Sequence, residues 1–206
     1  MSTRGKFITF EGIDGAGKSS HLDLLCGLAR AKGHAVERTF EPGGTPFGQR
    51  MREVVLRHEA PALAEAIAIF AARSAHVEQV IEPALAAGRW VVCDRFTDST
   101  YAYQCGGRGL DVGLVERLEE IVHPGLQPDA TFLFDVDPAT AAARQGARGT
   151  EADKFERQVS DFHLRVRDAY LKRARRFPRR IRVIDASGTR EDVGRRLEAE
   201  FAQVFP

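Results

Sequence analysis

A glycine-rich segment near the start of the chain has the residue types and spacing that bind phosphate. It reads Gly-Ile-Asp-Gly-Ala-Gly-Lys-Ser from Gly12 to Ser19 and follows the apolar run Phe7–Phe10. Glycines let the backbone turn its amides toward phosphate oxygens, and a helix that begins near Lys18 adds the positive end of its dipole. We expect Lys18 to hold the β- and γ-phosphates and Ser19 a Mg²⁺ ion. The spacing predicts that the chain binds a nucleoside triphosphate; the alternative is a strand-to-helix turn without a ligand.

A second candidate pair is Asp94-Arg95, which directly follows the apolar run Trp90–Cys93. In a parallel sheet, ligands collect beyond the carboxyl ends of the strands, so this pair should lie at the same edge as the phosphate loop. Asp94 would order Mg²⁺ or its water, and Arg95 would bridge phosphates. The alternative is an ion pair at the end of a strand. Because the chain also contains the phosphate loop, we favour the functional interpretation of Asp94 and Arg95.

The elements that must position these residues alternate along the chain. Short apolar runs typical of strands alternate with longer helical patterns, which predicts an α/β fold. Five parallel strands would form one sheet with helices on both faces, the three-layer architecture of P-loop NTP hydrolases. The expected strands are Lys6–Glu11, Ala35–Phe40, Arg89–Asp94, Ala130–Val136 and Ile181–Ile184.

Helices are expected between these strands, and Gly33 and Gly88 stand where two of them should end. The segment 144–154 differs, because glycines and charged residues dominate it without apolar periodicity. It is either a flexible LID or an ordinary solvated loop. The expected helices are Lys18–Lys32, Phe47–Arg57, Leu63–Ala87, Val112–Val122, Pro138–Gln145, Lys154–Phe177 and Arg190–Val204.

Composition limits the class of protein. The 206 residues are 43% hydrophobic and 29% charged, without a composition break, so we expect one domain spanning residues 1–206. The net charge of +1 gives no basic field for nucleic acid or an anionic membrane, and we expect neither partner. Cys26, Cys93 and Cys105 lack metal-ligand spacing, which indicates reduced thiols. With no charged-then-apolar leader and no membrane-length run, a cytoplasmic location is expected.

Two classes of nucleotide-binding protein are disfavoured. A signalling GTPase needs an Asn-Lys-x-Asp guanine reader, and the chain has no asparagine. A motor or helicase needs more length and a basic track for its polymer. A small phosphotransferase fits better.

Longer motifs make the chain similar to the thymidylate kinases, a family of nucleoside monophosphate kinases, over nearly its whole length. The most specific segment is 94–104, Asp-Arg-Phe-Thr-Asp-Ser-Thr-Tyr-Ala-Tyr-Gln, followed by Gly-Gly-Arg-Gly-Leu at 106–110. Phe10-Glu11-Gly12, Glu41-Pro-Gly-Gly-Thr-Pro46 and Asp185-Ala-Ser187 also resemble the family. The resemblance implies phosphorylation of dTMP to dTDP with ATP and Mg²⁺ in dTTP biosynthesis, by a homodimer with a LID.

The resemblance also implies roles for individual residues. Asp14 would accept the 3′-hydroxyl of dTMP, Arg52 and Arg95 would hold its phosphate, and Tyr103 would crowd the 2′ position. The residues implied in dTMP binding are Asp14, Glu41, Arg52, Phe70, Arg73, Arg95, Ser99, Tyr103 and Gln104. Those implied in ATP binding are Gly12, Ile13, Asp14, Gly15, Ala16, Gly17, Lys18, Ser19, Ser20 and Arg144. The metal ligands would be Ser19 and Asp94, and the catalytic residues Lys18, Arg95, Arg144 and Arg148.

Some of these roles have structural alternatives. Arg52 and Arg73 lie in predicted helices, where an isolated arginine is usually solvent-facing. Tyr103 and Gln104 are also compatible with packing and capping a loop. Arg144 and Arg148 are candidates because family members carry a transition-state arginine in the phosphate loop or the LID, and position 15 is glycine here.

Three departures from the family pattern bear on the substrate. Phe40 replaces an arginine before Glu41, Lys154 replaces an arginine in the LID, and Ile69 replaces the phenylalanine that stacks on thymine. Phe70, next to Ile69, is expected to reach the base from a rotated angle. These departures keep two alternatives open: a kinase for another deoxynucleoside monophosphate, or a nucleotide-binding regulator without catalysis.

Overall fold

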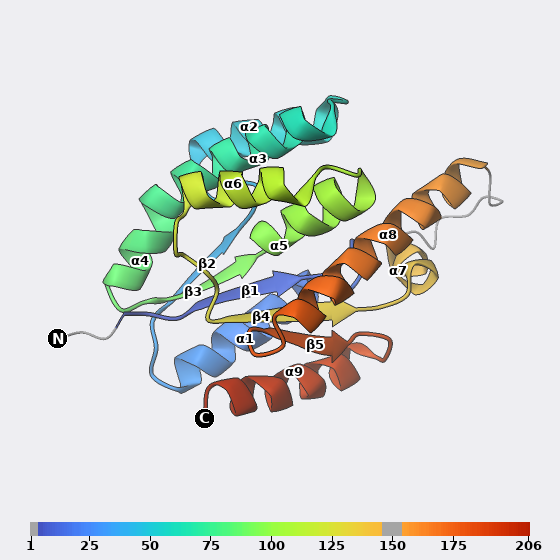
Figure 1. Ribbon diagram of the computed structural model, residues 1–206. Helices are drawn as coiled ribbons and strands as arrows, with labels where there is room; N and C mark the ends of the chain where they lie inside the picture. The colour runs from blue at the N-terminus through green and yellow to red at the C-terminus, as the bar shows by residue number, and fades with distance from the viewer. Residues whose placement is uncertain (1–3, 146–153) are drawn as a thin grey trace.

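The sheet of this protein has five parallel strands, as the sequence predicts. The computed structural model describes residues 4–145 and 154–206. The strands lie in the order β2-β3-β1-β4-β5, and every neighbouring pair is parallel (Figure 1). Their bounds are β1 Phe7–Glu11, β2 Val36–Phe40, β3 Trp90–Asp94, β4 Ala130–Asp135 and β5 Ile181–Asp185.

The strand register brings the polar ends of the strands to one edge. Phe10 pairs with Asp94 of β3 and with Phe132 of β4, so Glu11 and Asp94 end their strands side by side. Glu41 follows β2 and donates its backbone N–H to the carbonyl of Asp94 at 2.9 Å. The other side chains of β1, β3 and β4 are mostly apolar and buried, so the charged groups of these strands are confined to this edge.

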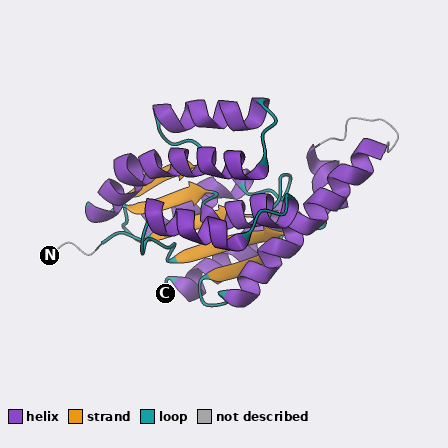
Figure 2. Cartoon of the chain, turned by 45° about the horizontal axis from the view of Figure 1, so that its top comes forward, coloured by secondary structure: helices purple, strands orange, loops and turns teal. Residues whose placement is uncertain are grey.

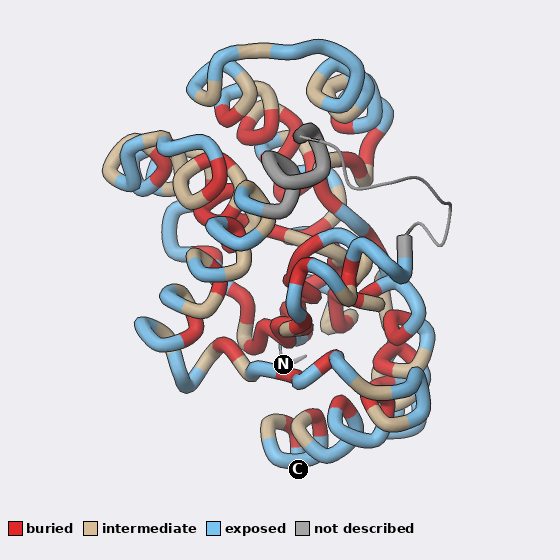
Figure 3. The backbone as a smooth tube through the Cα atoms, turned by 90° about the vertical axis from the view of Figure 1, so that its right-hand side faces the viewer, coloured by how far each residue is buried: buried red, intermediate tan, exposed pale blue. Residues whose placement is uncertain are grey.

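Helices cover both faces of the sheet (Figure 2), with α1 and α9 on one face and α3, α5 and α6 on the other (Figure 1). The buried positions concentrate where these layers meet (Figure 3). The helices of the described residues are α1 Ser19–Ala31, α2 Pro46–Arg57, α3 Ala62–His76, α4 Glu82–Ala86, α5 Thr97–Thr100, α6 Val112–Val122, α7 Pro138–Gln145, α8 Lys154–Arg176 and α9 Arg190–Val204, with π-helical turns η1 Val77–Ile81 and η2 Tyr101–Gly107.

Two helical segments differ from the sequence prediction. The segment predicted as one helix, Leu63–Ala87, is α3, the wide turn η1 and α4. Pro83 lies just after η1 and has no N–H to donate one turn back, so a wider turn accommodates the lost hydrogen bond. The other difference is Thr97–Gly107, which is helical although no helix was predicted there, because its polar residues and glycines lack an apolar helical period.

Two glycines explain how α8 packs against η2. A Cβ atom on Gly106 would lie 2.4 Å from the Cβ of Ala169, and one on Gly107 would lie 2.4 Å from the ring of Phe162. Only glycine therefore allows this close approach, which holds the 94–104 motif against α8. The remaining elements agree with the prediction to within one residue at each end.

The helix ends predicted at two glycines are confirmed. Gly33 and Gly88, with φ of 86° and 76°, follow the ends of α1 and α4. Cys93 is fully buried in the apolar cluster around Phe96. Within residues 4–145 and 154–206, no helix combines the length and the apolar character that a membrane span requires.

Candidate active site

The phosphate loop lies between β1 and α1 and depends on the backbone freedom of glycine. Gly12, Gly15 and Gly17 have φ of 136°, 82° and 89°. A Cβ on Gly12 would also lie 2.4 Å from the carbonyl oxygen of Phe134. The loop therefore packs tightly on β4 while α1 begins at Ser19, directly after Lys18.

Lys18 is buried under this loop. Its Nζ donates to the carbonyls of Gly12 at 2.9 Å and Ile13 at 3.1 Å. Burial, and then the charge of Arg95, lowers the pKa of Lys18 to about 7. Bound phosphates would reverse this shift, because they favour the charged ammonium.

Ser19 and Asp94 form an oxygen-rich pair that fits a Mg²⁺ ion. The Ser19 hydroxyl donates to Asp94 Oδ2 over 3.4 Å. The other carboxylate oxygen, Oδ1, is buried and has no hydrogen-bond partner among the described residues. Mg²⁺ prefers carboxylate and hydroxyl oxygens together with substrate phosphates, so this donor set suits it.

Arg95 lies where the phosphate loop meets the 94–104 motif. Its backbone has φ of 71°, which is strained for a residue other than glycine. Its guanidinium donates to Asp14 at 2.7 Å and to the hydroxyls of Ser99, Tyr103 and Tyr170 at 3.1 Å each. A network this dense fixes one side-chain orientation and compensates for the backbone strain.

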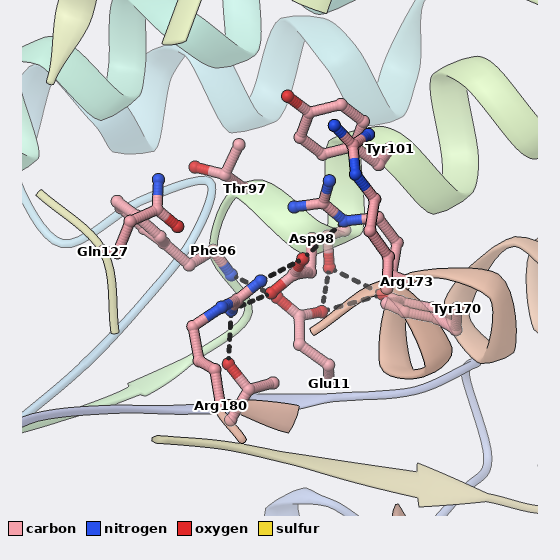
Figure 4. A network of polar contacts seen from close by, with 12 residues as sticks. Glu11, Phe96, Thr97, Asp98, Tyr101, Gln127, Tyr170, Arg173 and Arg180 are labelled. Carbon is pink, nitrogen blue, oxygen red and sulfur yellow. Dashed lines mark hydrogen bonds and ion pairs between the residues drawn. The ribbon is translucent and has the colours of Figure 1, made fainter. Parts of the chain in front are cut away.

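Glu11 supports Arg95 through the hydroxyls of Ser99 and Tyr170, which contact both residues. It accepts hydrogen bonds from the Phe96 N–H at 2.7 Å, the Ser99 hydroxyl at 2.6 Å and the Tyr170 hydroxyl at 2.8 Å. Figure 4 shows Glu11 next to Asp98 in this network. Burial, and then the charge of Asp98, raises the pKa of Glu11 to about 7.

Arg73 is buried rather than solvent-facing, with 1% of its surface exposed. Its Nε donates to Glu41 at 2.7 Å, and its other nitrogens reach the Thr100 hydroxyl at 3.2 and 3.3 Å. His76 Nδ1 lies 2.9 Å from the other oxygen of Glu41. Burial alone would raise the pKa of Glu41, but Arg73 and His76 outweigh it and lower the pKa below its ordinary value.

Two hollows adjoin at these residues. The larger one, about 900 Å³, follows the phosphate loop, and the smaller one, about 230 Å³, lies between α2, α3 and η2. The residues that line both are Asp14, Glu41, Arg52 and Arg95. Arg52 donates to the carbonyl of Pro42 at 3.1 Å, which places its side chain over this junction.

Most of the predicted site residues line one of these hollows. The larger hollow is lined by Gly15, Gly17, Lys18, Ser19, Ser20, Asp94 and Arg144 as well as the shared residues. Gly12, Ile13 and Ala16 are buried. The smaller hollow is lined by Arg73, Ser99, Tyr103 and Gln104 in addition to the shared residues.

Among the described residues, Phe70 is a predicted dTMP-binding residue that is not part of either lining. Phe70 is 1% exposed and lies against the guanidinium of Arg73, whose carbon is 4.5 Å from the ring centre. Ile69 lines the smaller hollow instead, since adjacent helical residues point in different directions. Arg148, like most of the proposed LID, lies outside the described residues.

Residues that sequence reasoning gave no role complete the arrangement. Glu11, His76 and Tyr170 are buried and hold residues of the site, but their partners come from other elements. Of these three, only Glu11 has a feature in the sequence that could have identified it: it is a carboxylate at the end of an apolar strand, in the Phe-Glu-Gly motif. At the other end of the site, Arg144 donates to the carbonyls of Ala186 at 2.8 Å and Gly188 at 3.0 Å.

Comparison with known proteins decides the family. The family model described as thymidylate kinase matches residues 10–197. The chain belongs to the thymidylate kinase family. Members of this family phosphorylate dTMP to dTDP, and this is the reaction of the chain.

Individual thymidylate kinases are similar over nearly the full length. The chain is 52% identical to the thymidylate kinase of Methylobacillus flagellatus over 184 residues, 89% of this chain and 90% of that one. It is 51% identical to that of Burkholderia vietnamiensis over 203 residues, covering 97% and 98%. The crystal structure of thymidylate kinase from Ehrlichia chaffeensis superimposes with a TM-score of 0.78 at 33% identity, covering 97% and 99%.

Proposed function

We propose that the larger hollow binds ATP and the smaller hollow binds dTMP, so that the two reacting phosphates meet at Arg95. The observation that carries this proposal is the junction of the hollows at Asp14, Glu41, Arg52 and Arg95. Two cations, Arg52 and Arg95, stand at that junction. They suit a place where the γ-phosphate of ATP and the phosphate of dTMP must approach each other despite their like charge.

Catalysis in this arrangement consists of positioning and charge neutralisation. The attacking oxygen of dTMP is already ionised, so no strong general base is needed. Lys18 would turn from the loop carbonyls to the β- and γ-phosphates, and Arg95 would hold the acceptor phosphate in line. The hydrogen bonds of Arg95 to Ser99, Tyr103 and Tyr170 keep its guanidinium oriented before the substrate arrives.

Ser19 and Asp94 would hold Mg²⁺. The ion neutralises charge on the β- and γ-phosphates when bound. At the far end of the larger hollow, Arg144 would border adenine together with the 186–188 segment, to which it is hydrogen-bonded. Arg148 is proposed as the arginine that meets the transferring phosphoryl group.

The acceptor side would bind the deoxyribose and the base. Tyr103 donates to Asp14 at 3.1 Å, so its ring stands beside the carboxylate proposed to accept the 3′-hydroxyl and would exclude a 2′-hydroxyl. Ser99, Gln104 and Arg73 would border the thymine. Ile69 offers the base an apolar contact in place of an aromatic stack.

The whole chain would act as one domain, in the cytoplasm, and as a homodimer. A family whose members match over nearly the entire length of this chain supports a single catalytic unit. The segment from 144 to 154 would serve as the LID that covers ATP.

The test of this assignment is ADP production with ATP and Mg²⁺ and six acceptors in parallel: dTMP, dUMP, dCMP, dGMP, dAMP and UMP. We expect a strong preference for dTMP. We also expect Lys18→Ala to remove the activity while the melting temperature stays near that of the wild type. Equal turnover of dCMP or dGMP would contradict the placement of dTMP in the smaller hollow, and full activity of Lys18→Ala would contradict the role of the loop.

A further inference from the structure

The smaller hollow contains an acidic side chain on α3 that no sequence motif singled out. We propose that Glu65 is a positioning residue for base selection, whose carboxylate holds the Gln104 amide with its oxygen toward the base. This inference rests on the proposed function of the smaller hollow as the dTMP site. In this inference, Gln104 faces the base, and Glu65 beside it controls the choice between thymine and cytosine.

The two side chains come from elements far apart in the sequence. Glu65 lies in the first turn of α3, and Gln104 lies in η2. Gln104 Nε2 donates to Glu65 Oε1 at 2.7 Å, and both residues line the smaller hollow. Gln104 is 4% exposed, so water does not compete strongly for its amide.

The chemistry of the pair determines which end of the amide faces Glu65. An ionised carboxylate can only accept hydrogen bonds, so it must face the NH₂ group of Gln104. The amide oxygen then points away from Glu65, and the described residues provide no donor for it. In the hollow, that oxygen is an acceptor for a group of the ligand.

Glu65 itself is held in place by Arg108. The guanidinium pairs with Glu65 Oε2 and also donates to the carbonyl of Ala60 at 2.7 Å. The side chain of Glu65 is only 14% exposed and lies directly against the Arg108 cation. The carboxylate therefore presents one oxygen to Arg108 and the other to Gln104.

The fixed amide distinguishes the pyrimidine bases. Thymine carries a hydrogen on N3, which can donate to the amide oxygen. Cytosine has a lone pair at N3, which would face the oxygen without a hydrogen between them. A buried acceptor that meets another acceptor loses its hydrogen bond and is penalised. A flipped amide would reverse this preference, and Glu65 prevents the flip.

The experiment compares dTMP with 5-methyl-dCMP, which share the methyl group and differ only at N3 and the 4 position. The variant Glu65→Gln keeps the size of the side chain but can either donate or accept, so the Gln104 amide can take both orientations. We expect the kcat/KM ratio of dTMP to 5-methyl-dCMP to fall by about 10- to 100-fold, with most of the change in KM. Binding of each nucleotide without ATP should show the same loss of selectivity by calorimetry.

Two further variants separate positioning from structural support. Arg108→Met removes the ion pair but leaves the carboxylate, and we expect its selectivity to stay within about fivefold of the wild type. In a Gln104→Ala background, Glu65→Gln should not change the ratio further, because the amide that it positions is gone. Unchanged selectivity in Glu65→Gln, or a full additional loss when Glu65→Gln is added to the Gln104→Ala background, would overturn the inference. A wild type without dTMP preference would instead contradict the proposed function.

Discussion

At the residue scale, Lys18 couples phosphate binding to a proton. Burial and then Arg95 lower its pKa to about 7 in the free protein, and its Nζ is held by the carbonyls of Gly12 and Ile13. Phosphates favour the charged form and raise the pKa again. Above pH 7, we therefore expect ATP binding to take up a proton and its affinity to fall as the pH rises.

This prediction can be measured by calorimetry in buffers with different ionisation enthalpies. At about pH 8, where ATP is fully ionised, we expect uptake of nearly one proton per ATP. Lys18→Arg keeps a fixed positive charge and should bind ATP without this uptake. If the wild type takes up no proton, Lys18 is already charged in the free protein and the prediction is wrong.

Single residues also show what a sequence reveals about a site. The positions of Lys18, Ser19, Asp94 and Arg95 were predictable because short motifs bind phosphate through local spacing, and these residues do lie together. The supporting roles of residues such as His76 were not predictable. They depend on burial and on partners in distant elements, and no local pattern records either.

The same limit explains the position of Phe70. A helical pattern shows that adjacent residues point in different directions, but it does not show which direction faces a hollow. The structure places Ile69 in the hollow and Phe70 against Arg73. Phe70 packs with Tyr101 of η2 and Val115 of α6, and such contacts between elements determine this rotation.

At the scale of elements, Asp98 holds α5, which lies within the 94–104 motif, against the end of α8. It is 3% exposed and accepts from Arg173 at 2.8 Å and from Arg180 at 2.6 and 3.0 Å (Figure 4). Burial alone would raise the pKa of Asp98, but Arg180 and then Arg173 outweigh it and lower the pKa. The buried carboxylate therefore compensates two cations at once.

Loss of this carboxylate should destabilise the fold. We expect Asp98→Asn to lower the free energy of unfolding by roughly 3 kcal/mol at neutral pH, because two partly buried arginines lose their counterion. Thermal and urea unfolding would measure this. Asp168→Asn, which breaks the exposed pair with Lys172 on the same helix, is the matched control and should cost less than about 1 kcal/mol.

The pH dependence of the free energy of unfolding gives a second measure of the ion pairs that Asp98 forms with the two arginines. Because the folded pKa of Asp98 is lowered, its contribution is complete above the unfolded value of about 3.9 and is lost as the pH falls through the folded value. The difference between the wild type and Asp98→Asn should therefore shrink only in strong acid. A difference that is already absent at neutral pH would show that Asp98 does not hold α5 to α8.

Element boundaries were predictable wherever a helix carried a continuous apolar stripe. The prediction failed at Pro83 and in the 97–107 segment, and in both places the backbone widens into a π-helical turn. In the second of these turns, Gly106 and Gly107 let α8 approach closely. The glycines are visible in the sequence, but the helix that fills the space above them is contributed by residues more than fifty positions away.

At the scale of the whole molecule, the exposed apolar side chains are unevenly distributed. Seven of the ten large apolar side chains that are exposed in the described residues lie on α2, α3 and α6, which pack side by side (Figure 1). Ile121 on α6 is 76% exposed and Ile67 on α3 is 50% exposed. An apolar concentration of this kind marks a contact surface, and it supports the proposal that this face joins two copies of the chain.

We expect the wild type to sediment as a dimer at micromolar concentration. Ile121→Arg places a charge in the proposed contact and should weaken dimerisation by at least about 30-fold. Leu164→Arg, on α8, makes the same chemical change at a side chain that is 48% exposed but outside this face, and it should leave the dimer intact. A wild-type monomer would contradict the proposal directly. Equal weakening by both variants would mean that the added charge acts generally, and that α2, α3 and α6 are not where the copies meet.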